Sequence, residues 1–186
     1  MAGIDLSTAG VKIGYAPEAT AGTRPTTGYK KIPGIKSVPE LNPEPDNLES
    51  TTLEETEWKT YVPGLKDPGG ALGFGANLTE KLMEIWDEVI DAYDTAAAAN
   101  KGLWFCIIIP GLTKALFFKG QPTPMGMPGM EVSAILETTL YITPTGAPAW
   151  EVKPASLEEG DASGAAVEAA SYSARQTAKK TSEVDV

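Results

Sequence analysis

The run from Pro39 to Trp58, PELNPEPDNLESTTLEETEW, constrains the fold of this 186-residue chain more than any other segment. It contains seven carboxylates and neither lysine nor arginine. Three prolines within its first seven residues exclude a helix there and favour extended backbone. Its apolar residues do not recur at helical spacing, so the run offers no continuous face for burial against its own domain. We therefore predict an arm, over residues 39–66, that reaches for another subunit; a solvated surface loop is the alternative.

Most of the negative charge lies in that arm. Of the net charge of −10, residues 37–58 contribute −7 and residues 151–186 contribute −3, from seven acids against four bases. The rest of the chain has eleven acids and eleven bases and sums to zero. No cluster of lysine or arginine offers a binding surface for phosphates, so the sequence argues against direct nucleic-acid binding.

Length and hydropathy indicate a single domain without a membrane span. A chain of 186 residues is long enough for one core but short for two domains. No apolar run approaches the roughly 20 residues that cross a bilayer. The N-terminus, MAGIDLSTAG, lacks the basic and apolar regions of a secretory signal. We expect no association with a membrane.

The residue types that catalysis and metal binding need are scarce. The chain has no histidine, which removes the usual general base and the commonest transition-metal ligand. The single cysteine, Cys106, lies in an apolar run and is predicted to be buried and inert rather than a reactive nucleophile. The glycine-rich segment GGALGFG lacks the lysine and Ser/Thr of a P-loop, and PEPDNLES lacks the ligand spacing of a calcium loop. We predict no enzymatic activity, no cofactor and no metal.

Most of the remaining sequence has the pattern of short strands. A continuous apolar run, LWFCIII, indicates a strand covered on both faces, and the alternation in WKTYV (58–62) indicates a half-buried one. Turns are expected at Pro63–Gly64 and over 67–70, and an adaptable methionine-containing loop over 120–130. The expected strands are 11–17, 28–38, 58–62, 71–78, 103–109, 114–119, 130–143 and 148–152.

One segment departs from the β pattern. Over residues 78–100 the apolar side chains recur at helical spacing, which predicts a helix with one stripe buried against a sheet. Asn77 is a candidate N-cap, with Glu80 three residues later, and Gly102 is a candidate left-handed end. The opposite face is acidic and is expected to be solvated. The buried stripe comprises Leu82, Ile85, Trp86, Val89, Ile90 and Tyr93.

The order of these features resembles that of the major tail (tail-tube) proteins of long-tailed bacteriophages. The phrases LNPEPDNLESTTLEETEWKTYVPGLKDPG and GALGFGANLTEKLMEIWDE are similar to tail-tube subunits of phages that infect Gram-positive bacteria. The resemblance covers residues 4–152, within a β domain of residues 1–154. It does not explain residues 155–186, which are rich in Ala, Ser and Glu and are expected to form a flexible tail.

The resemblance implies a mainly β fold: two packed antiparallel sheets, sandwich- or barrel-like, flanked by one amphipathic helix and carrying a long extended arm. It implies a virion protein, assembled in the host cytoplasm, whose homo-hexameric rings stack into a tube through which DNA passes without sequence-specific binding. The tape measure and the tail terminator are the other implied partners. The arm residues then become assembly contacts, namely Glu44, Asp46, Leu48, Glu49, Leu53, Glu54, Glu55, Glu57 and Trp58.

A ring made by heterologous contacts needs two different complementary patches on each subunit. The acidic arm and the net basic residues 1–36, with Lys12, Arg24, Lys30, Lys31 and Lys36 against Asp5 and Glu18, are a candidate pair. Two other interpretations remain open. A secretion-system tube or head–tail joining ring protein would share the sheets and the six-fold ring. A monomeric carbohydrate-binding β-sandwich would need exposed aromatic residues on one concave face.

Overall fold

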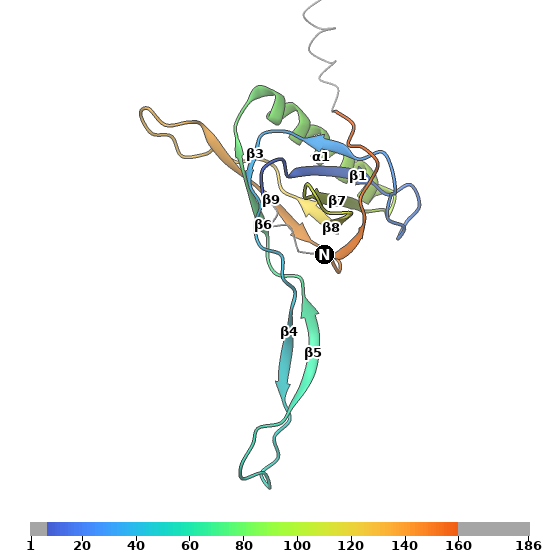
Figure 1. Ribbon diagram of the computed structural model, residues 1–186, viewed down its shortest axis with the longest axis vertical. Coiled ribbons are helices and arrows are strands. Elements are labelled where there is room, and N and C mark those ends of the chain that lie inside the picture. Colours follow the sequence, from blue (N-terminus) through green and yellow to red (C-terminus); the bar gives the residue numbers. More distant parts are fainter. Residues whose placement is uncertain (1–6, 160–186) are drawn as a thin grey trace, which may run out of the picture.

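The computed structural model of the protein describes residues 7–159, which form a curled sheet, one helix and a projecting hairpin (Figure 1). In chain order the elements are β1 Lys12–Pro17, β2 Lys30–Ile32, β3 Ile35–Ser37, β4 Glu44–Glu49, β5 Tyr61–Asp67, β6 Leu72–Asn77, α1 Glu80–Ala98, β7 Leu103–Ile108, β8 Lys114–Pro122, β9 Glu137–Pro144 and β10 Ala149–Val152.

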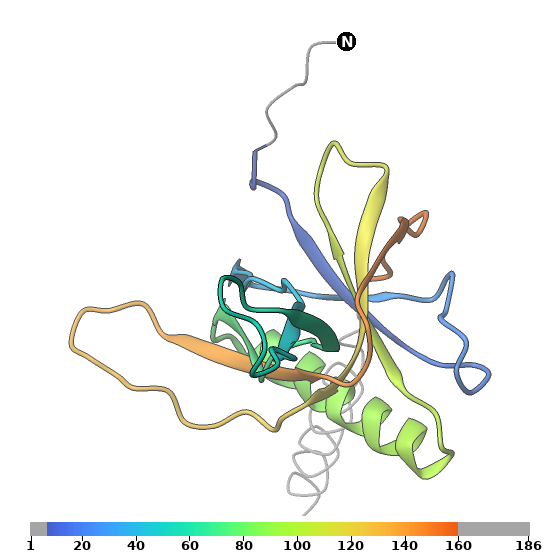
Figure 2. The ribbon, with the colours of Figure 1, turned by 90° about the horizontal axis from the view of Figure 1, so that it is seen from below.

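Strand β8 divides the body into two halves. The main sheet has eight strands in the order β2-β1-β7-β8-β9-β6-β3, with β10 paired to β8 off this path. One edge of β8 pairs with β7 over residues 116–119; the other edge pairs with β10 over 114–117 and with β9 over 120–122. The sheet curls around β8, so that side chains from β1 and β7 meet those from β6 and β9 in one core (Figure 2).

The two ends of the sheet are joined by a bend in the chain. β2 and β3 lie at opposite ends of the strand order, yet only Pro33 and Gly34 separate them. Gly34 has a φ of 75°, which glycine adopts without strain. The single strand expected over 28–38 is therefore wrong, because the bend lets this segment pair with β1 in one half and with β6 in the other. The predicted fold class, mainly β and sandwich- or barrel-like with one helix, is confirmed.

Helix α1 packs against β1, β2 and β7 and against the dividing strand β8 (Figure 1). The predicted stripe is the one buried: Leu82, Ile85, Trp86 and Val89 belong to the main core, and Ile90 and Tyr93 pack against it partly buried. The indole N–H of Trp86 donates to the carbonyl of Thr123 at 3.0 Å, which fixes the start of the segment between β8 and β9.

Both predicted ends of the helix are wrong by about two residues. The N-cap is Thr79, whose hydroxyl accepts a hydrogen bond from the N–H of Leu82 at 3.2 Å; Asn77 instead ends β6. At the other end the left-handed residue is Asn100, with φ of 54°. Gly102 has another role, since a Cβ there would lie 1.9 Å from the Cε atom of Lys119.

A second apolar cluster lies on the outer face of β1, β7 and β8. It comprises Ala16, Tyr29, Cys106, Ala115 and Phe117, and Leu157 packs against it. Residues 155–159, expected to begin a flexible tail, therefore lie on the body, while the tail from residue 160 onward is outside the described residues. Within residues 7–159, no helix is long and apolar enough to cross a membrane.

Candidate assembly surface

The predicted arm is an antiparallel hairpin of β4 and β5 that projects from the body (Figure 1). Glu44 pairs with Asp67 at its base, and Glu49 pairs with Tyr61 toward its tip. The acidic run therefore supplies one strand and much of the tip, and the residues after Trp58 supply the return strand. The side chain of Glu44 is outside the described part of the structure.

Two local predictions for the return strand are wrong. β5 begins at Tyr61 and is exposed, where a half-buried strand was expected over 58–62. Pro63 and Gly64 do not turn the chain but lie inside β5, where the pairing register shifts opposite Asp46. A Cβ on Gly64 would lie 2.9 Å from the Asp46 carbonyl oxygen, so this bulge requires glycine.

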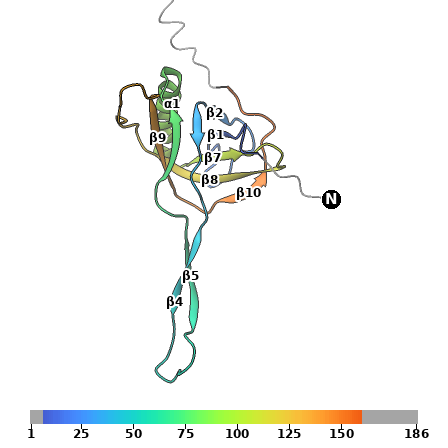
Figure 3. The same cartoon turned by 60° about the vertical axis from the view of Figure 1, so that its left-hand side comes forward.

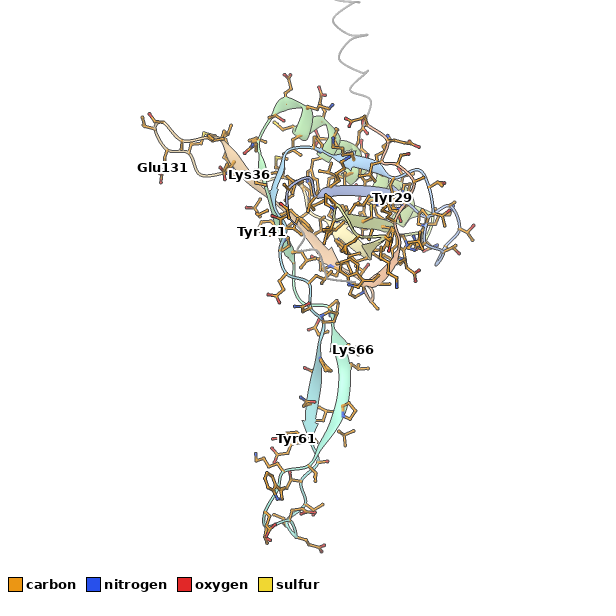
Figure 4. All side chains as sticks on the ribbon, viewed as in Figure 1. Tyr29, Lys36, Tyr61, Lys66, Glu131 and Tyr141 are labelled. Carbon is orange, nitrogen blue, oxygen red and sulfur yellow. The ribbon has the colours of Figure 1, made fainter. Side chains whose placement is uncertain are left out.

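The hairpin leaves large apolar side chains in solvent. Trp58 is 80 % exposed and Leu65 is 88 % exposed. Figure 4 places Tyr61 toward the tip and Lys66 toward the body. The sequence singled out Leu48, Leu53 and Trp58. It missed Tyr61 and Val62 because a half-buried strand was expected there, and it missed Leu65 because Pro63 and Gly64 indicated a turn. The full set is Leu48, Leu53, Trp58, Tyr61, Val62 and Leu65.

The acidic residues of the hairpin differ in their partners. Glu49 forms an ion pair with Lys59 across the hairpin at 3.0 Å. Glu54, Glu55 and Glu57 are exposed at the tip and have no ion pair among residues 7–159. The same holds for Asp46, whose side chain lies beside the bulge. The tip thus combines unpaired carboxylates with the apolar side chains of Leu53 and Trp58.

A second projection carries exposed apolar residues away from the body in another direction (Figure 2). It comprises residues 123–136, and Glu131 lies near its end in Figure 4. The long strand expected over 130–143 is wrong in its first half, because β9 begins only at Glu137. An open cavity of about 660 Å³ lies between this segment and the outer face of β6 and β9. The exposed apolar side chains are Met127, Met130, Val132, Ile135 and Leu136.

The buried carboxylate of Glu18 is already saturated with partners. It accepts hydrogen bonds from the N–H of Gly22 (3.0 Å), the N–H of Gly102 (2.9 Å) and the indole of Trp104 (2.9 Å), and the Lys119 ammonium lies 3.4 Å away. Burial alone would raise the pKa of this carboxyl, but these hydrogen bonds and the lysine charge outweigh burial and lower the pKa to about 2. So strong an acid is a poor general base near neutral pH, and its role is structural.

Cys106 is buried, as predicted. Burial raises the pKa of its thiol to about 12, which keeps it protonated and unreactive near neutral pH. Among the described residues, no group of three or more cysteines, aspartates or glutamates is arranged to hold a metal ion. The features that distinguish this molecule are therefore its two projecting, partly apolar segments.

No family model matches the chain, and no curated protein matches its sequence. A search of solved structures finds a chain of "Cryo-EM structure of the anti-feeding prophage (AFP) baseplate, 6-fold symmetrised", with a TM-score of 0.57 and 11 % sequence identity. The match covers 82 % of this chain and 98 % of that chain. The two chains share a fold. This architecture therefore also occurs in a chain of that baseplate structure.

Proposed function

We propose that this chain is a structural subunit of a phage-tail-type assembly, and specifically a tail-tube protein that forms six-fold rings. The observation that carries the proposal is the projecting hairpin, which exposes six large apolar side chains. A hairpin of two strands gains little stability alone in water, and exposed apolar patches mark interaction sites. The match to a chain of a six-fold baseplate structure supports an assembly role for such a fold.

The geometry of the projections favours a heterologous contact. The hairpin and residues 123–136 leave the body in different directions, so one copy can reach two neighbours (Figures 1 and 2). A head-to-tail contact of this kind closes into a ring when its rotation closes, and otherwise forms a filament. The proposed six-fold ring requires the closed outcome.

Charge supports a conduit rather than a DNA-binding protein. Outside residues 37–58 and 151–186 the acids and bases balance, so the body has no excess of positive charge to capture DNA by counterion release. The resemblance to tail-tube proteins further supports a subunit of a long-tailed phage of Gram-positive bacteria, which would assemble in the host cytoplasm and contact a tape measure and a terminator. We propose that the chain has no enzymatic activity.

The placement of the exposed aromatic side chains favours a structural subunit over a carbohydrate-binding module. The exposed aromatic side chains are divided among separate elements, with Trp58 and Tyr61 on the hairpin, Tyr141 on β9 and Trp150 on β10. Figure 4 shows Tyr61 and Tyr141 well apart. Sugar binding by stacking requires such rings on one shared face.

Size-exclusion chromatography with negative-stain microscopy tests the proposal. We expect rings or tubes from the full chain. A variant with residues 45–66 replaced by a short Gly/Asn turn should keep a cooperative thermal transition and form none. The bridge is short because Glu44 and Asp67 are already cross-strand partners. A compact monomer at every concentration, or assembly unaffected by the deletion, contradicts the proposal.

A further inference from the structure

The tripeptide Leu-Glu-Glu occurs twice in this chain, each time after a hydroxyl-bearing residue. Residues 52–55 read Thr-Leu-Glu-Glu at the hairpin tip, and residues 156–159 read Ser-Leu-Glu-Glu after β10. The first copy is exposed, with Leu53 fully in solvent. The second copy is docked on the body of the same chain. The docked copy shows what a binding site for the exposed one requires.

The docked copy pairs with the outer edge of β2. The N–H of Lys31 donates to the carbonyl of Glu158, and the N–H of Glu158 donates to the carbonyl of Tyr29, both at 2.8 Å. Glu158 forms a parallel bridge with Lys30. These bonds use only backbone atoms, so any extended segment can make them.

The side chain of Leu157 occupies a notch that exists because residue 14 is glycine. A Cβ on Gly14 would lie 2.7 Å from a methyl carbon of Leu157 and 3.2 Å from the sulfur of Cys106. The floor is the outer apolar cluster, which includes Cys106 and Phe117. A leucine after the hydroxyl-bearing residue is thus the side chain for which this notch is shaped.

Positive charge surrounds the last residue of the docked copy. Glu159 forms an ion pair with Lys31 at 3.0 Å. The hydrogen bond and charge of Lys31 lower the pKa of the Glu159 carboxyl, and the charges of Lys81 and Lys12 lower it further. Lys31 therefore contacts this exposed carboxylate directly, and Lys81 and Lys12 add positive charge at longer range. The docked copy thus places an apolar side chain, Leu157, in the notch and a carboxylate two residues later, Glu159, beside Lys31.

We propose that the hairpin tip of a second copy docks at this site and displaces the segment 156–159. Leu53 then fills the notch over Gly14, the backbone of Glu54 pairs with β2, and Glu55 faces Lys31. This inference rests on the proposed function and names the contact by which copies join. The hairpin points away from the body, while the docked segment runs beside β1 and β2, so a tip cannot reach the site of its own chain (Figures 1 and 3).

The exchange has a defined conformational step. At the free tip, one exposed hydrogen bond from the N–H of Glu55 to the carbonyl of Thr52, at 3.2 Å, closes a turn. Docking opens this turn into the extended form that residues 156–159 already have. The segment 156–159 thus covers the β2 edge of a free subunit, as exposed edges require, until a neighbour replaces it.

Carbodiimide cross-linking of the native chain tests the contact, because it joins a lysine to a carboxylate without a spacer and so requires the two groups to be in contact. We expect a link between Lys31 and Glu55 in assembled protein. Mixing isotope-labelled and unlabelled chains identifies it as a link between copies. The Lys59–Glu49 pair is the built-in control, since it links within one chain whether or not the protein assembles.

A peptide of residues 51–58 tests the site without assembly. It should bind the full-length Leu157→Ser, Glu159→Gln variant at least about tenfold more tightly than the native chain, whose own segment competes. A Lys31→Glu change in that variant, or Leu53→Ser in the peptide, should weaken binding by a similar factor. A peptide with the same residues in scrambled order is the control.

The outcomes separate this inference from the proposed function. Tubes that form without a link between Lys31 and Glu55 leave the proposed function standing and overturn docking at this site. An affinity for the peptide that is unchanged by Lys31→Glu overturns docking at this site as well. A chain that stays monomeric at every concentration overturns the proposed function and, with it, a second copy as the occupant.

Discussion

Glu18 joins the nearby turn at Gly22 to Gly102 and Trp104, which are distant in the chain and lie just before and within β7. Its partner Lys119 reaches it across Gly102, where any side chain would collide with the lysine stem. Sequence reasoning did not find this network. Nothing in the neighbourhood of Glu18 distinguishes it from the solvated acids elsewhere, because its partners are brought together only by the fold.

The network should make stability depend on pH in a defined window. The pKa of Glu18 falls from 4.5 to about 2 on folding, so its contribution is complete above about pH 4.5 and is lost as the pH falls through 2. The shift corresponds to roughly 3 kcal/mol. We expect Glu18→Gln to lower the free energy of unfolding at pH 7 by up to that amount.

Urea unfolding at several pH values between 2 and 7 measures the effect. The fall in stability of the native protein between pH 4.5 and 2 should be smaller in Glu18→Gln, because the variant has no charge to lose. Glu57→Gln, at the exposed hairpin tip, is the matched control and should follow the native profile. Parallel profiles for the native chain and Glu18→Gln would show that Glu18 does not hold the barrel end.

Trp86 is the largest side chain that helix α1 buries in the core. Its side chain is 1 % exposed, and replacing such a residue by alanine costs roughly 3–5 kcal/mol. We expect a loss of that size for Trp86→Ala in a denaturant titration, and almost none for Asp87→Ala on the exposed face. Equal losses for the two variants would mean that the buried face is assigned wrongly.

The hairpin should be a separate unit of stability. Gly64→Ala places a methyl group against the Asp46 carbonyl and should loosen the bulge. We expect lower hydrogen-exchange protection over β4 and β5 with an unchanged thermal midpoint, since no described side chain of β4 or β5 belongs to the core. Gly70→Ala, at a position with open space, is the control. A lowered midpoint for Gly64→Ala alone would show that the hairpin supports the barrel.

Periodicity explains which elements the sequence predicted well. The helix stripe and the buried strand around Cys106 were found because each covers several residues of one pattern. The predicted ends of elements were wrong where contacts with a segment distant in the chain set them. Gly34 divides one expected strand into two, because the two halves pair with different strands. Gly64 lies inside β5, because the pairing register shifts there opposite Asp46 and forms a bulge. The hairpin residues were found through charge and proline, whereas the docked segment 156–159 has no periodic pattern that could predict it.

At the scale of the whole molecule, the acids and the apolar residues of the hairpin tip have different consequences for assembly. Charges on a rim mainly set the rate of encounter, and buried apolar contacts mainly set the rate of dissociation. Glu54, Glu55 and Glu57 face solvent beside Leu53 and Trp58, so both effects act at one tip. Salt separates them, because it screens the first and, when strongly hydrated anions are used, strengthens the second.

We expect sodium chloride to lower the rate at which assemblies grow. We expect sodium sulfate to lower the rate at which they dissociate on dilution. The screening length falls from about 10 Å at 0.1 M salt to about 3 Å at 1 M, which would weaken the proposed attraction between the acidic tip and Lys31 beside Glu159. Reversing the charge of Glu54, Glu55 and Glu57 should slow growth as high salt does. Light scattering during growth and after dilution measures both rates. If neither salt changed either rate, the hairpin tip would not be the surface through which copies of this chain meet.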